Sequence, residues 1–121
     1  MRRILVTGAN KGIGLALVEA ILSTHADTFV FLCSRDLERG RDAAAPLAEV
    51  YPGRVEVVQL DVADERSVAE AKTQVADRLG DERLRAVVNN AGIGMKTPEA
   101  ARIIDTNTLG VRRVCEAFLP L

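Results

Sequence analysis

Four short, mostly apolar runs alternate with longer segments of helical periodicity. The runs are ILV at 4–6, TFVFLC at 28–33, VEVVQL at 55–60 and AVV at 86–88. They lack a strict two-residue alternation, which is typical of parallel strands that helices cover on both faces. Because crossovers between parallel strands are right-handed, this alternation predicts an α/β fold with a doubly wound parallel sheet in the strand order 3-2-1-4.

The segments between these runs have the apolar spacing of helices. Residues 12–24 are apolar nearly all round, which predicts a helix packed deeply on the sheet. Residues 64–79 form one apolar stripe, with Asp64 as the N-cap. A helix over 37–51 is expected to be kinked or shortened by Pro46. From Pro98 the sequence predicts one long helix that Pro120 ends, with an inward stripe at Ile103, Ile104, Val111, Val114 and Phe118.

The composition is that of one soluble domain spanning residues 1–121. With 16 Lys plus Arg against 17 Asp plus Glu, the net charge of −1 disfavours nucleic acid and anionic membranes as partners. There is no apolar stretch near the ~20 residues of a membrane span and no signal-peptide core, so we expect a cytoplasmic protein. Cys33 and Cys115 have no metal-site spacing and are predicted to be buried free thiols, without a metal.

A glycine-rich sequence, TGANKGIG at 7–14, directly follows the first predicted strand and opens the first helix. Glycines there allow a tight turn, let backbone amides approach a phosphate, and let the helix pack closely on the strand. The spacing G-x-x-x-G-x-G differs from the commoner G-x-G-x-x-G dinucleotide motif. A strand-to-helix turn that merely requires positive φ is the alternative interpretation.

The end of the second predicted strand favours NADP(H) over NAD(H). An NAD site usually has an acidic residue there for the ribose 2′-hydroxyl, whereas this chain has Ser34 followed by Arg35. The guanidinium of Arg35 suits a 2′-phosphate, and Lys11 adds a second positive charge. The alternatives are an exposed ion pair of Arg35 with Asp36 or Glu38, and a solvated Lys11.

Polar residues also follow the third and fourth strands. Asp61 could accept a hydrogen bond from an adenine amino group, and the Asn pair in NNAG at 89–92 could brace the loop around a nucleotide. Asp61 could equally be a turn or capping residue. Asn107 lies on the apolar stripe of the last helix, where its amide needs a partner such as a backbone carbonyl. His25 falls in a polar turn and is not a candidate base.

TGANKGIG, Asp61-Val62, NNAG and Asn107 in DTNTLG occur in the order in which the short-chain dehydrogenase/reductase family has them. The chain resembles that family and, through NKGIGLA at 10–16 and SRDLERG at 34–40, its NADPH-dependent carbonyl reductases. The resemblance covers the whole chain, but only the family's amino-terminal half. It implies a Rossmann-type fold, truncated after the fourth helix, and a cofactor, NADP(H).

The resemblance also implies roles for individual residues. Asn107 would match the catalytic Asn that helps to hold a proton-relay water. The cofactor-binding residues would be Gly8, Asn10, Lys11, Gly12, Ile13 and Gly14 at the pyrophosphate and nearby ribose, Arg35 at the 2′-phosphate, Asp61 and Val62 at the adenine, and Asn89, Ala91 and Gly92 at the central part of the nucleotide.

The family's proton-donating residues have no counterpart in these 121 residues. In the family, hydride passes from nicotinamide to a carbonyl while a Tyr, in Tyr-x-x-x-Lys, donates the proton and a Ser polarises the oxygen. Tyr51 is the one tyrosine here, and position 55 is Val. Two interpretations remain: the cofactor half of an NADPH-dependent reductase of small carbonyl compounds, or a stand-alone NADP(H)-binding module or non-catalytic partner subunit. Because strand 86–88 would form a bare sheet edge, a homo-oligomer or self-association is expected.

Overall fold

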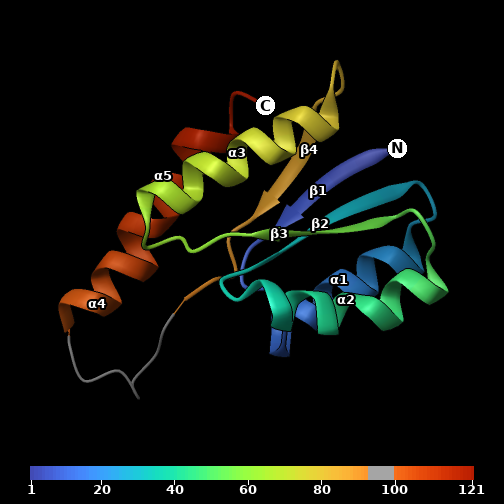
Figure 1. The fold of residues 1–121 in the computed structure, drawn as a ribbon, viewed down its shortest axis with the longest axis horizontal. Coiled ribbons are helices and arrows are strands. Elements are labelled where there is room, and N and C mark those ends of the chain that lie inside the picture. The colour runs from blue at the N-terminus through green and yellow to red at the C-terminus, as the bar shows by residue number, and fades with distance from the viewer. Residues whose placement is uncertain (93–99) are drawn as a thin grey trace.

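The computed structural model describes residues 1–92 and 100–121 of the protein. Within them four parallel strands form one sheet in the order β3-β2-β1-β4 (Figure 1). The predicted α/β fold and strand order are therefore confirmed. The strands are β1 (Arg2–Val6), β2 (Thr28–Ser34), β3 (Val55–Gln59) and β4 (Leu84–Val88).

Helices cover both faces of the sheet, as Figure 1 shows. One face carries α1 (Gly12–Thr24) and α2 (Leu37–Val50). The other carries α3 (Glu65–Leu79) and α5 (Gly110–Phe118). Before α5 come α4 (Ala100–Ile104) and a π-helical turn, η1 (Asp105–Leu109).

Strand β2 explains the two-sided core. All seven of its residues are buried, and successive side chains point to opposite faces of the sheet. Phe29 and Phe31 pack in the cluster beneath α3 and α5, whereas Val30 and Leu32 pack in the cluster beneath α1 and α2. The central residues of a strand buried on both sides, here Phe29–Cys33, have to be apolar on both faces, which is why the strand lacks an alternating pattern.

Two helix predictions differ in part from the structure. The predicted shortening at Pro46 does not occur, because α2 continues through Pro46 to Val50. Pro46 and Asp42 are both exposed, so the Asp42 carbonyl that loses its helical partner can bind water. In α1, burial is restricted to Gly14, Val18 and Leu22. Ile13 is 81% exposed, because the sheet covers one side of this helix.

The last helix also differs from its prediction. A single α-helix was expected from Pro98, a residue outside the described ranges. Over 105–109 the chain forms the wider turn η1, and α5 follows from Gly110. An inserted π-helical turn shifts the register of the side chains that follow it. Val114 and Phe118 are buried as expected, whereas Ile104 is 57% exposed.

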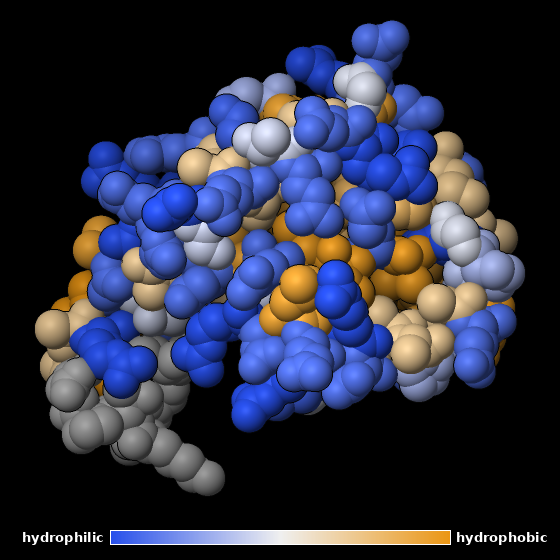
Figure 2. All heavy atoms as spheres, viewed as in Figure 1, coloured by the Kyte–Doolittle hydropathy of each residue, from blue (hydrophilic) through white to orange (hydrophobic). Residues whose placement is uncertain are grey.

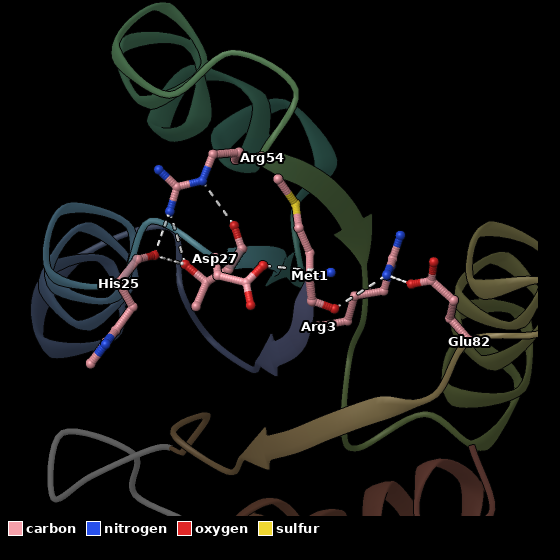
Figure 3. Close-up of polar contacts among 7 residues, drawn as sticks. Met1, Arg3, His25, Asp27, Arg54 and Glu82 are labelled. Atoms are coloured by element: carbon pink, nitrogen blue, oxygen red, sulfur yellow. Dashed lines mark hydrogen bonds and ion pairs between the residues drawn. The ribbon is translucent and has the colours of Figure 1, made fainter.

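An arginine closes the turn between α1 and β2 at the amino ends of the strands (Figure 3). Arg54 donates from Nε to the Thr28 carbonyl at 2.9 Å and from Nη2 to the carbonyls of Leu22 at 3.0 Å and His25 at 2.7 Å. It thus satisfies carbonyls that the end of α1 leaves without helical partners. His25, which falls in this turn, is exposed and lies at this end of the sheet.

Figure 2 shows mainly hydrophilic side chains over both helical layers, with apolar atoms visible between the layers where the strands lie. No helix in the described ranges is long and apolar enough to cross a membrane.

Candidate functional site

A cleft of about 480 Å3 lies at the carboxyl ends of the strands. It brings together ten of the thirteen predicted site residues: Gly8, Asn10, Lys11, Gly12, Ile13, Arg35, Asp61, Val62, Ala91 and Gly92. Three predicted residues, Gly14, Asn89 and Asn107, do not line it. The strand order explains the gathering, because β4 lies beside β1 and both strands end at this edge of the sheet.

The connection from β1 into the first turn of α1 needs glycine at two positions. Gly8 has φ +59° and Gly12 has φ +58°, a region that side-chain-bearing residues rarely adopt. A Cβ atom on Gly8 would also lie 2.8 Å from the Cα atom of Ala91. The β1–α1 loop therefore lies directly against the loop that follows β4.

Gly14 acts in packing. It is buried in the first turn of α1, where a Cβ atom would lie 2.5 Å from Nδ2 of Asn90 and 2.6 Å from the carbonyl oxygen of Gly8. The Asn90 side chain donates to that same carbonyl at 3.1 Å. The absence of a side chain at position 14 thus lets α1 approach the loop after β1 and the loop after β4.

Thr7, which is not among the predicted site residues, supports the loop after β4. Its buried hydroxyl oxygen accepts from the backbone N–H groups of Asn90 at 3.0 Å and Ala91 at 2.9 Å. The hydroxyl also donates to the Val88 carbonyl at 3.4 Å. The feature of the sequence that could have identified Thr7 is a hydroxyl side chain at the end of β1, the strand predicted to lie beside β4.

The two asparagines of NNAG have different surroundings. Asn90 lines the cleft, whereas Asn89 is exposed and its side-chain amide donates to Sγ of Cys115 at 3.8 Å. Cys115 is half-buried, so its predicted full burial was wrong. Cys33 is buried as predicted, and burial raises the pKa of its thiol, which keeps it neutral. No cluster of metal-ligating side chains occurs within 1–92 and 100–121.

The first turn of α1 differs from those of α2 and α3. Asp36 and Asp64 cap α2 and α3 by accepting backbone N–H groups, and a glutamate follows in each first turn. Lys11, the N-cap of α1, makes no side-chain capping bond, and no acidic residue lies in its first turn. The amide groups at this end, together with the helix dipole, therefore favour an anionic ligand in the cleft.

Arg35 and Lys11 are exposed residues that line the cleft. Asp36 is engaged by Arg39, whose backbone N–H it accepts at 3.0 Å and whose Nε lies 3.9 Å away. Among the residues the structure describes, Arg35 has no carboxylate within ion-pair distance. Ser34 is buried, and its hydroxyl donates to the Asp36 carbonyl at 2.7 Å, so it shapes the turn that presents Arg35.

Asp61 has a structural role in its turn. Its Oδ1 accepts from the Ala63 N–H at 3.0 Å, and its own N–H donates to Oγ of Ser67 at 2.9 Å. The carboxylate still lines the cleft. A carboxylate has room for several hydrogen bonds, so this turn bond leaves acceptor sites for a ligand.

Asn107 lies in η1, and its predicted inward position was wrong because it is exposed. The π-helical turn takes it out of line with Val111 and Val114. Its side chain lies beside Gly92, where a Cβ atom would be 3.1 Å from the Asn107 Oδ1. Arg102, Asp105 and Thr106 also line the cleft; no local spacing pattern marks them, because the course of α4 and η1 brings them there.

Known proteins are similar to this chain in both sequence and fold. Human carbonyl reductase [NADPH] 1 is 39% identical over 125 residues, which cover 97% of this chain and 43% of that protein. Human 17-beta-hydroxysteroid dehydrogenase type 1 is 38% identical over 128 residues, covering 97% of this chain and 38% of that protein. A crystal structure of NADPH-bound carbonyl reductase from chicken fatty liver matches with a TM-score of 0.85 at 33% identity, over 99% of this chain and 48% of that one.

The chain spans less than half the length of each of these three relatives. A sequence model of the short chain dehydrogenases matches residues 2–121. This match includes the glycine-rich loop after β1, the NNAG sequence after β4, and Asn107. The chain belongs to the short chain dehydrogenase family.

Proposed function

We propose that this chain binds NADP(H) and forms the cofactor-binding part of an oxidoreductase that transfers hydride between NADPH and a small carbonyl compound. One observation carries the proposal: the uncapped first turn of α1, Arg35 and Asp61 line a single cleft at the carboxyl edge of the sheet. The printed names of the carbonyl reductase relatives, which include NADPH, support the choice of cofactor.

The residues of the cleft fit the parts of this cofactor. The glycine-rich loop and the first turn of α1 present backbone N–H groups that suit the pyrophosphate. Asp61 and Val62 form the wall suited to the adenine, and Arg35 with Lys11 provides positive charge for the 2′-phosphate. Ala91 and Gly92 would contact the central part of the nucleotide, with Asn89 behind them, and Asn107 would hold a water beside Gly92. Bound NADPH would supply the hydride.

Replacing Arg35 with aspartate is expected to weaken NADPH binding about tenfold or more, roughly 1.4 kcal/mol, while NADH binding changes little. The reason is the loss of the planar cation and the gain of repulsion toward the 2′-phosphate. Titration calorimetry with both cofactors measures the effect. Arg41→Asp, on an exposed position of α2, is the matched control with the same change in charge. Equal affinities for NADPH and NADH in the unmodified chain would refute the assignment.

A non-catalytic NADP(H)-binding module or partner subunit is the second candidate. In its favour, the one tyrosine of the sequence, Tyr51, ends α2, and its ring packs on the guanidinium of Arg54 at 5.4 Å instead of lining the cleft. Without a positioned proton donor, the 121 residues are expected to consume no NADPH with small aldehydes, ketones or quinones. Turnover that disappears in Arg35→Asp would favour an active site within this chain.

We expect the 121-residue chain to self-associate through β4, which is an edge of the described sheet. The Leu84 N–H donates to the Leu121 carbonyl at 3.0 Å, so Leu121 hydrogen-bonds the first residue of this edge strand. Light scattering over a concentration series measures the association. Ala86→Lys places a charge on the exposed edge and should reduce it, whereas Ala45→Lys on exposed α2 should not. A concentration-independent monomer would contradict this expectation.

A further inference from the structure

Arg113, on α5, joins two walls of the cleft. Its Nη2 lies 2.6 Å from Oδ1 of Asp105 in η1, and its Nη1 donates to the Val62 carbonyl at 3.1 Å. A longer bond of 3.5 Å runs from Nη1 to the Asp105 carbonyl. The side chains of Arg113 and Asp105 are 20% and 37% exposed, so the pair is partly shielded from water, more than a fully exposed ion pair. Val62 and Asp105 both line the cleft.

Close backbone contacts surround the same turn. A Cβ atom on Gly110 would lie 2.8 Å from Cγ2 of Val62, and one on Gly92 would lie 3.1 Å from Oδ1 of Asn107. The segment 105–110 is therefore placed between the loop after β3 and the loop after β4. A shift of this segment in either direction would move Asn107 relative to Gly92.

A π-helical turn needs support from outside the helix. This geometry is rare, and η1 has no buried residue that could anchor it by packing. The Asp105–Arg113 ion pair and the bond from Arg113 to Val62 supply directional restraints instead. Charge-assisted hydrogen bonds with a planar guanidinium restrict orientation as well as distance.

We infer that Arg113 is a positioning residue for the cofactor site. Its guanidinium holds η1 against the Val62 carbonyl, which sets the separation between the adenine wall and Asn107. The effect on cofactor binding rests on the proposed function, whereas the effect on the position of η1 is a property of the chain without cofactor. The two can therefore be measured separately.

The neighbouring residue provides a matched control. Arg112 forms an ion pair of 2.8 Å with Glu116, one turn further along the same helix. Both side chains are mostly exposed, at 73% and 65%, and neither lines the cleft. Arg112→Met and Arg113→Met thus remove the same group and the same charge from adjacent positions.

The experiment compares the 121-residue chain with Arg113→Met, Arg113→Lys, Asp105→Asn and Arg112→Met. The NMR signals of the Asn107 side-chain amide and of the Val62 and Ala63 backbone amides are recorded without cofactor. NADPH dissociation constants are then measured by calorimetry. Arg113→Met should shift these signals and weaken NADPH binding about tenfold, the effect of losing one charge-assisted hydrogen bond. Arg112→Met should leave the signals unshifted and the NADPH dissociation constant within about twofold of that of the unmodified chain.

The lysine variant separates positioning from general stability. Lysine keeps the charge but lacks the planar fork that reaches Asp105 and Val62 together, so Arg113→Lys should recover only part of the affinity at a thermal midpoint near that of the unmodified chain. If Arg113→Met does not fold, Arg113→Lys and Asp105→Asn decide by the same readouts. Arg113 and Arg112 variants with equal signals and affinities would overturn the inference. Failure of the unmodified chain to bind NADPH would refute the proposed function, and the cofactor-free NMR comparison would still test the position of η1.

Discussion

Replacing Gly14 with alanine is expected to destabilise the protein by about 2 kcal/mol or more and to weaken NADPH binding. Alanine normally favours a helix over glycine by about 1 kcal/mol. Here its methyl group would lie 2.6 Å from the carbonyl oxygen of Gly8 and 2.5 Å from Nδ2 of Asn90. Because the Gly8 contact is with backbone, relief requires α1 to move away from the loop whose amides face the cleft.

Chemical denaturation measures the change in the free energy of unfolding, and calorimetry measures the affinity for NADPH. Gly12→Ala is the comparison, because a Cβ atom there meets nothing within 4 Å and the cost comes from φ +58° alone, about 1 kcal/mol. A Gly14→Ala variant as stable as the unmodified chain would show that α1 does not need this close approach.

Replacing Thr7 with valine is expected to destabilise the protein by about 2–3 kcal/mol, although valine has nearly the same shape. The substitution removes the acceptor that the Asn90 and Ala91 N–H groups share at 3.0 and 2.9 Å. Donors left without a partner in a half-buried loop cost more than the hydrogen bond itself was worth. The loop after β4 should then become more mobile, and its backbone amides should exchange with solvent faster.

Hydrogen exchange at the Asn90 and Ala91 amides tests the effect on the loop, and chemical denaturation measures the change in the free energy of unfolding. The control is Thr73→Val, because Thr73 is exposed on α3 and its hydroxyl donates to the Ala69 carbonyl of its own helix at 3.2 Å. That variant should change the free energy of unfolding by less than about 0.5 kcal/mol. If both threonine variants behave alike, the hydroxyl of Thr7 does not support the loop.

Together these two residues show how the cleft is built. Gly14 allows α1 to approach, and Thr7 holds the loop after β4 in place, yet neither lines the cleft. Residues of the loops after β1 and β4 that do line it, such as Gly8 and Ala91, therefore depend on contacts made behind them. Substitutions in the supporting residues are expected to lower both stability and affinity, whereas Arg35→Asp should lower affinity alone.

The sequence alone was sufficient to determine the sheet and much of the cleft. The solidly apolar run 28–33 could only be a strand covered on both sides, and Asp64 was recognisable as a helix cap because its side chain acts within its own turn. Gly8 was placed correctly in the turn after the first strand and Gly12 at the start of the first helix, and both have positive φ. The cap and the turn depend on interactions among residues close in sequence, and the strand is marked by its own apolar composition.

Only the tertiary structure decided which polar groups face the cleft. Asn89 and Asn90 are neighbours of the same type, yet the path of the loop over Thr7 turns Asn90 inward and leaves Asn89 exposed beside Cys115. Asn107 was misplaced because α-helical periodicity does not reveal η1, a turn held by contacts of Arg113 with Asp105 and Val62. Such contacts join segments up to 84 positions apart, so they follow from how the layers pack and not from any local pattern of residues.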